Sequence, residues 1–353
     1  MKNISWWKWL GVILIVYTFL AGMLVPLGHG IVEINPRSVK TGEQAQFTLV
    51  GYNSHYEQDK DGLRAWLKLD DEHAIGAKEI RVKGDRILEL DFDIPAYLPV
   101  SKRVQDFSLI LDSETDGTAV LPTAVLVTQD SIDEEKGVSA WKNSAITGLT
   151  VTTGMTFPFR AIIYETIRNT YFHVALWLSM MLLFIAAVVY SIRYVRDPQP
   201  IWDSKARAFT SVGLFFGILG LVTGMIWAAY TWGKPWSNDV KQITTAIALL
   251  VYLAYFILRS AFEDPEQKGR ISAVYNIFAF VLLIPLIYVI PRMVDSLHPG
   301  AGGNPAFGSE DLDSTMRMVF YPAIIGWALI GAWIANLQYR MDAIREKWIE
   351  NLD

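Results

Sequence analysis

The chain has 353 residues, of which 52% are hydrophobic, 13% aromatic and only 19% charged, so it is more apolar than an ordinary soluble domain. Its net charge of -5 comes without a stretch rich in lysine or arginine, which argues against a nucleic-acid partner. It contains no cysteine, which excludes a disulfide scaffold, a thiolate nucleophile, an iron–sulfur cluster and a metal held by cysteine.

The first predicted element is a membrane span over about residues 7–26, with Lys2 and Lys8 at its start. The run matches the length of about 20 helical residues that a bilayer core requires. Tryptophans at its start are typical of an interfacial belt and favour an anchor that is retained, so residues 1–30 are predicted to be an N-terminal transmembrane anchor. A cleaved signal peptide is the alternative, because residues 28–30 (GHG) could form a small-x-small cleavage site.

Residues 31–135 predict an antiparallel β-sandwich. Short stretches of alternating apolar and polar residues are separated by turn-type clusters, a pattern typical of such a domain. These stretches are residues 44–50, 63–69, 87–94, 107–111 and 119–127. His55 and His73 lie among polar residues here and are expected on the surface. Residues 136–171, after the acidic run at 130–135, are predicted to be a linker and interfacial segment.

Five more apolar spans follow and predict a membrane domain over residues 172–339, before a cytoplasmic tail at 340–353. The spans are residues 172–192, 208–231, 240–258, 271–290 and 318–337. The predicted fold class is therefore an all-α polytopic membrane protein of about six helices, with an inserted β-sandwich. Glycines recur along one side of the third span, a pattern that lets helix backbones approach closely and indicates packing. They are Gly213, Gly217, Gly220 and Gly224.

Basic residues predict the orientation of these spans, because cytoplasmic loops carry an excess of lysine and arginine. They concentrate after spans two, four and six, namely Arg193, Arg196, Lys205, Arg207, Arg259, Lys268, Arg270, Arg340, Arg345 and Lys347. The sandwich, the loop at 232–239 and the loop at 292–317 then share the outer side. We therefore expect a protein of the cell inner membrane whose sandwich and outer loops face the periplasm.

Both histidines of the membrane half are predicted on that outer side. His173 begins span two, His298 follows span five, and the loop WGKPWSND at 232–239 lies between spans three and four. Two neutral imidazoles can supply both axial ligands of a haem iron, and tryptophans can line a flat macrocycle. Haem propionates favour cationic partners, for which the outer loops offer Lys234, Lys241, Arg292 and Arg317. The alternative interpretation is that each histidine and tryptophan is an ordinary polar or aromatic residue at the membrane interface.

Three stretches resemble a known family. The spacing WGxxWxxD, with Trp232, Gly233, Trp236 and Asp239, is similar to the tryptophan-rich WWD signature of haem-handling proteins. YFHV, which ends at residue 174, and LHPG, which starts at residue 297, are similar to the histidine motifs of the cytochrome c maturation protein C family. The similarity covers about residues 157–339, and the first span by position.

The resemblance implies a role as a haem transfer and assembly protein, not an enzyme. Such proteins hold haem b non-covalently at the outer membrane face, through two axial histidines. They present it to a membrane-anchored haem chaperone, and ATP-driven transporter subunits then release the loaded chaperone for c-type cytochrome biogenesis. The resemblance gives axial ligation to His173 and His298, and haem cradling to Trp232, Gly233, Trp236 and Asp239.

The sequence departs from the family pattern at several positions. Pro235 and Asn238 stand where the family has tryptophans, and Lys241 stands where it has an arginine. Proline removes an aromatic contact but stiffens the loop, and lysine keeps the charge without the bidentate fork. The family also has a short loop in place of the sandwich, for which docking of the haem chaperone or of an apocytochrome is one hypothesis.

Three other functions remain open from the residues alone. A permease subunit of an ATP-driven exporter would need polar residues at mid-membrane depth, and spans two to five are nearly free of charge there. A cytochrome c synthase-type haem lyase shares the tryptophan signature, but such proteins tend to carry further histidines inside the membrane. A sandwich that acts alone, with the helices as an anchor, would leave five of the predicted spans unexplained.

Overall fold

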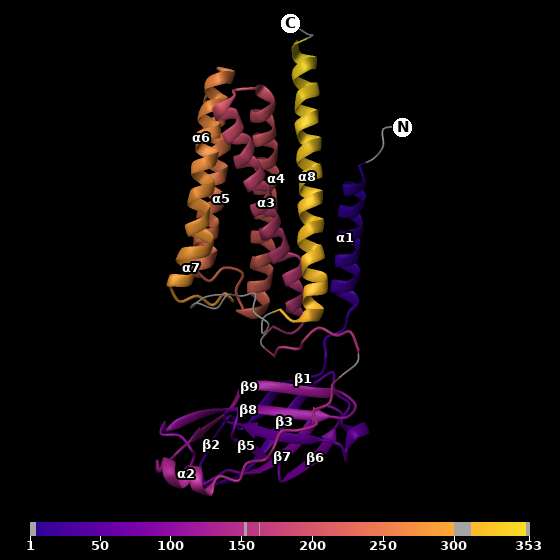
Figure 1. The fold of residues 1–353 in the computed structure, drawn as a ribbon, viewed down its shortest axis with the longest axis vertical. Helices are drawn as coiled ribbons and strands as arrows, with labels where there is room; N and C mark the ends of the chain where they lie inside the picture. The colour runs from indigo at the N-terminus through magenta and orange to yellow at the C-terminus, as the bar shows by residue number, and fades with distance from the viewer. Residues whose placement is uncertain (1–4, 152–153, 162, 300–311, 351–353) are drawn as a thin grey trace. The chain divides into compact units, whose positions relative to one another are not determined.

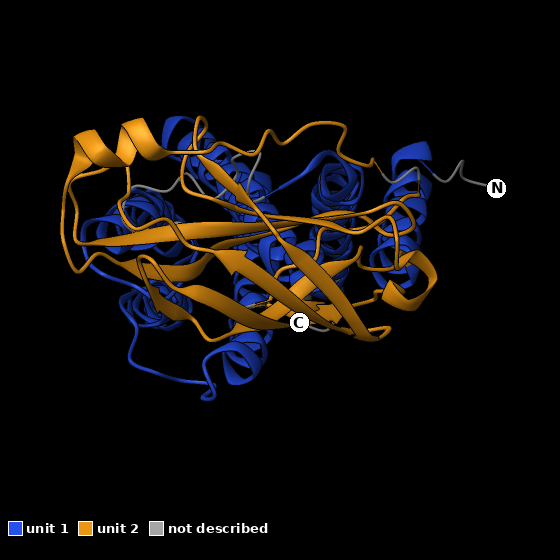
Figure 2. Cartoon of the chain, turned by 90° about the horizontal axis from the view of Figure 1, so that it is seen from below, with its two compact units in different colours: residues 1–24, 166–353 blue, residues 25–165 orange. Residues whose placement is uncertain are grey.

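The structure, a computed structural model, describes residues 5–151, 154–161, 163–299 and 312–350 (Figure 1). The chain divides into two compact units (Figure 2). One unit is Val25–Glu165, and the other combines Met1–Leu24 with Thr166–Asp353.

The first unit consists of two β-sheets. The sheet with strand order β1-β3-β7-β6 contains Gly30–Asn35, Gln44–Tyr52, Ile87–Asp93 and Glu79–Gly84. The sheet with order β2-β9-β8-β4-β5 contains Ser38–Lys40, Gly117–Thr128, Val104–Ser113, Arg64–Lys68 and Ala74–Gly76. Each of the five stretches predicted from alternation is a strand. Burial alternates along β3, and apolar residues of both sheets, such as Phe47 and Phe107, share one buried core. Such a core between two sheets is the architecture of a sandwich.

Two parts of the predicted fold class need correction. The term all-α holds only for the helical unit, because the chain between residues 30 and 128 is rich in strands. The sandwich is also not wholly antiparallel, since β2 pairs with β9 in parallel. β1 ends at Asn35, and the next residue, Pro36, has no N–H with which to continue the ladder. The chain then pairs with the other sheet, and this non-local pairing has no signature in local alternation.

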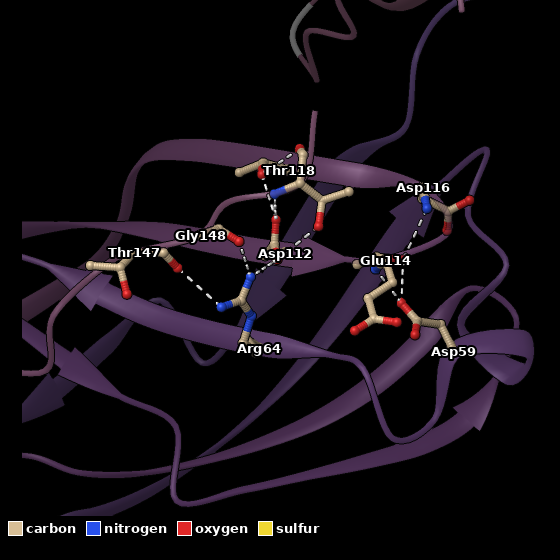
Figure 3. Close-up of polar contacts among 10 residues, drawn as sticks. Asp59, Arg64, Asp112, Glu114, Asp116, Thr118, Thr147 and Gly148 are labelled. Carbon is tan, nitrogen blue, oxygen red and sulfur yellow. Dashed lines mark hydrogen bonds and ion pairs between the residues drawn. The ribbon is translucent and has the colours of Figure 1, made fainter. Parts of the chain in front are cut away.

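The segment that follows the last strand is bound to the sandwich. Helix α2 (Glu134–Ala140) comes first, and Thr150 then donates its backbone N–H to the buried carboxylate of Asp112 over 2.7 Å. Asp112 also accepts hydrogen bonds from Thr118 and Arg64, and Arg64 in turn donates to the carbonyl oxygen of Gly148 (Figure 3). Burial by itself raises the pKa of Asp112, but these hydrogen bonds outweigh it and hold the pKa below its usual range. The carboxylate thus stays charged and binds the segment to the second sheet.

The second unit is a bundle of long apolar helices. They are α1 (Trp6–Leu24), α3 (His173–Arg196), α4 (Pro200–Thr231), α5 (Val240–Ser260), α6 (Pro265–Ile284) and α8 (Ser314–Glu350). A 3₁₀ segment, η2 (Tyr164–Tyr171), precedes α3, and α6 continues through a π-helical turn, η3 (Pro285–Val289), into the short helix α7 (Ile290–Met293). In the part of the chain that the structure describes, six helical segments are long and apolar enough to cross a membrane. The protein is therefore a multi-pass membrane protein, and the predicted number of spans is confirmed.

Helix α3 lies at the centre of this unit, where it packs against α4, α6 and α8 (Figure 1). The glycines of α4 make the contact with α3 close. A Cβ atom on Gly213 would lie 2.7 Å from the ring of Phe184, and one on Gly220 would lie 2.8 Å from that of Trp177. Larger residues would therefore separate the two helices. The glycine pattern reflects packing, as predicted, and its last member also meets a histidine.

Candidate functional site

His173 is the first residue of α3, and its ring lies against α4. A Cβ atom on Gly224 would lie 2.7 Å from its Cε1 atom, so the ring occupies space that only a glycine leaves. Its Nδ1 atom is 2.9 Å from the carbonyl oxygen of Gly220 and 3.2 Å from the hydroxyl of Thr223. A carbonyl oxygen can only accept, so we assign the proton of the neutral ring to Nδ1. The lone pair of Nε2 is then available to a ligand.

His298 lies in the loop that follows α7, and its neighbours set the same tautomer. Its Nδ1 atom is 2.7 Å from the carbonyl oxygen of Pro299, to which it donates. Burial, together with the charge of Lys241, lowers the pKa of His298 to about 4, so the ring is neutral at pH 7. Among the described residues, Nε2 of neither His173 nor His298 has a hydrogen-bond partner. Each ring thus has one nitrogen held by a carbonyl and one nitrogen free.

The two rings lie close enough to bind one metal ion between them. Their centroids are 6.4 Å apart and their planes meet at 45°. A metal–imidazole bond is about 2 Å long, and the ring centroid lies roughly 1 Å beyond the nitrogen, so two rings on one ion lie about 6 Å apart. No group of three or more His, Cys, Asp or Glu side chains in the described chain could hold a metal. A haem iron takes its axial ligands from the protein, and two imidazoles can fill these positions.

A tryptophan ring lies beside each histidine, and a third, Trp232, packs against one of these tryptophans; sequence reasoning identified only Trp232. The Trp227 ring lies 6.0 Å from that of His298 and 5.2 Å from that of Trp232, while Trp177 lies 6.3 Å from His173. Trp177 is four residues after His173, a helical spacing that indicates a neighbour on the same face. Trp227 lies in α4, five residues before Trp232, and only the packing of α4 brings its ring close to His298.

The rest of the tryptophan loop has an internal structure of its own. Gly233 has a φ of +74°, a backbone conformation that favours glycine, and lies in open space. The indole of Trp236 donates over 3.0 Å to the side-chain oxygen of Asn238, which has a φ of +58°. Asparagine tolerates that conformation better than most other residues. Within the described part of the chain, the ring of Trp236 contacts neither histidine ring, and its side chain is exposed.

Asp239 is buried and faces protein groups. Its side chain accepts from the backbone N–H of Lys241, which caps α5, and from Ser296 and Leu297 in the loop of His298. It therefore joins two of the three predicted outer segments.

The predicted cationic partners of the haem propionates differ in exposure. Lys234 and Arg292 are exposed, whereas Lys241 and Arg317 are half-buried. The charge of Lys241 contributes to the lowered pKa of His298. The Nε atom of Arg317 is buried without a hydrogen-bond partner in the described chain, a donor that a bound anion would satisfy.

Six apolar helices and a pair of histidines with free nitrogens define the class: a multi-pass membrane protein with a candidate site for a metal-bearing ligand. The chain belongs to the Heme exporter protein C family, whose family model matches residues 137–351. The resemblance found in the sequence is thereby confirmed. The strands between residues 30 and 128 precede the matched segment.

Three relatives, each called Heme exporter protein C, illustrate the extent of the similarity. The protein of Haemophilus influenzae is 27% identical over 161 residues, which is 43% of this chain and 65% of the relative. That of Bradyrhizobium diazoefficiens is 26% identical over 183 residues, 52% of this chain and 68% of the relative. That of Escherichia coli K12 is 26% identical over 161 residues, 43% of this chain and 64% of the relative.

Proposed function

We propose that this protein binds haem b non-covalently between His173 and His298 and delivers it for c-type cytochrome biogenesis. The observation that carries the proposal is the pair of rings 6.4 Å apart, each with Nδ1 bound to a carbonyl and Nε2 free. Outer-sphere hydrogen bonds of this kind orient a ligating imidazole and raise its basicity. The names of the relatives, which refer to haem export, support the same ligand.

Haem is the cargo in this proposal. Transfer takes place by ligand exchange at the haem iron, while the protein positions the haem and surrounds it. The protein is therefore a transfer factor and not an enzyme. Trp177, Trp227 and Trp232 offer aromatic walls, with Gly233 and Trp236 at the loop tip. We propose that the propionates bind cations of the outer segments, for which Lys241, Lys234, Arg292 and Arg317 are the candidates.

The proposed place of this chemistry is the periplasmic face of the inner membrane. Basic residues concentrate in the loops α3–α4 and α5–α6 and after α8, which the positive-inside rule assigns to the cytoplasm. The chain between α1 and α3, the tryptophan loop and the loop of His298 are then on the other side. We propose a membrane-anchored haem chaperone as the acceptor, ATP-driven transporter subunits as further partners, and docking of that chaperone as the role of the sandwich.

Absorption spectroscopy tests the proposal. The protein purified from haem-replete cells should show the bands of six-coordinate, low-spin haem, and His173→Ala and His298→Ala should each lose them. His55→Ala is the matched control, because His55 is an exposed histidine of the sandwich whose ring pairs with Asp116. A wild-type protein without haem bands, or bands that survive both site substitutions, would refute the site.

A further inference from the structure

We infer that Asp239 is a positioning residue for His298, and this inference rests on the proposed function. Both oxygens of its carboxylate are occupied by protein donors. Oδ1 accepts from the hydroxyl of Ser296 and the backbone N–H of Lys241, each over 2.9 Å, and Oδ2 accepts from the backbone N–H of Leu297 over 2.8 Å. A carboxylate would also repel the haem propionates. The aspartate that ends the tryptophan loop thus acts on the protein, and not on the cargo.

A short chain of hydrogen bonds leads from Asp239 to the ligand. The hydroxyl of Ser296 donates to Asp239 and accepts the backbone N–H of His298 over 3.1 Å. One carboxylate therefore holds both residues that directly precede His298. It accepts from the side chain of Ser296 and from the backbone of Leu297. Asp239 is only 9% exposed, so water competes little for these bonds.

The loop needs such support because no helix holds His298. Helix α7 ends at Met293 and α8 begins at Ser314, so the histidine lies outside both. Asp239, in contrast, lies at the first turn of α5 and is fixed by its cap bond to Lys241. Asp239 therefore ties the loop of His298 to helix α5. An aspartate at the junction of the tryptophan loop and α5 can thus support the loop of His298.

Hydrogen exchange on the haem-free full-length protein tests the support directly. Asp239→Asn removes the charge and replaces one acceptor oxygen with a donor, so the amides of Leu297 and His298 should exchange at least about tenfold faster. Asp295→Asn is the matched control, because Asp295 is an exposed aspartate in the same loop. Equal exchange in Asp239→Asn and wild type would overturn the inference.

The coordination state of haem is a second measurement. A residue that only stabilises the fold would not change it in this way. Asp239→Asn and Ser296→Ala should convert six-coordinate, low-spin haem to a five-coordinate, high-spin form held by His173, and free imidazole should restore the low-spin bands. His298→Ala should respond to imidazole identically. Loss of all haem from Asp239→Asn without imidazole rescue, or an unchanged spectrum, would contradict positioning. If wild type lacks haem bands, the proposed function fails, while the exchange experiment still decides the role of Asp239 in the loop.

Discussion

The two histidines are held in opposite ways. His173 belongs to a 24-residue helix, and its ring rests against glycines and a carbonyl of the adjacent helix α4. His298 belongs to a loop whose position depends on a carboxylate at the start of α5. The first ligand is therefore fixed by helix packing, and the second by a few polar bonds. If the two rings bind haem as proposed, we expect His298 to be the ligand that is released.

The largest effect on haem affinity is expected where α4 contacts His173 of α3. Gly224→Ala would place a Cβ atom 2.7 Å from the ring of His173. Overpacking of this kind costs about 1–3 kcal/mol, so haem binding should weaken by about tenfold. Haem titration of the purified protein measures the change.

Gly213→Ala is the matched control for that substitution. It crowds Phe184 equally, at 2.7 Å on the same helix, but does not meet a histidine. It should lower the unfolding temperature while haem affinity stays nearer to that of wild type. Equal loss of haem in both variants would show that His173 has no special dependence on α4.

A smaller effect is expected at the hydrogen bonds of His173. Thr223→Val removes one of two partners of Nδ1 and leaves the carbonyl oxygen of Gly220 in place. Haem affinity should fall by roughly threefold, less than the roughly 10–100-fold that loss of a whole outer-shell partner costs. Thr244→Val is the control, because the hydroxyl of Thr244 donates to backbone oxygens of its own helix, and it should leave the affinity unchanged.

The smallest effect on haem should come from the tip of the tryptophan loop. Asn238→Ala must adopt a φ of +58° without the bond to Trp236, which costs about 1–2 kcal/mol of stability. Thermal unfolding should show this loss, whereas Asn238→Gly should recover most of it because glycine tolerates the conformation. Haem binding should be unchanged in both, and a large loss would show that Trp236 contacts the cargo.

Much of the architecture could be predicted because it depends on local patterns. Apolar length indicates each span, and alternation indicates strands such as β3 and β7. The three-residue strands β2 and β5 are too short for alternation to reveal. The parallel pairing of β2 with β9 joins Val39 to Val127, and no local pattern encodes a partner so distant in the chain.

The site was predicted only in part, because local motifs name its residues but do not show how the helices bring them together. His173, His298 and Asp239 could be named from motifs, but the role of Asp239 could not, since the motif does not show which way a carboxylate points. Trp227 was missed because a tryptophan within an apolar span is ordinary, and only the packing of α4 brings it to His298.

The sequence by itself determined the number of spans, the sidedness expected from basic loops and the residue types available for ligation. Apolar length and charge bias act locally, so they can be read along the chain. The tertiary structure alone decided which nitrogen of each histidine is free and what Asp239 holds. The bond of His173 to α4 and the bond of Ser296 to Asp239 join residues 47 and 57 positions apart, so they form only when the helices pack.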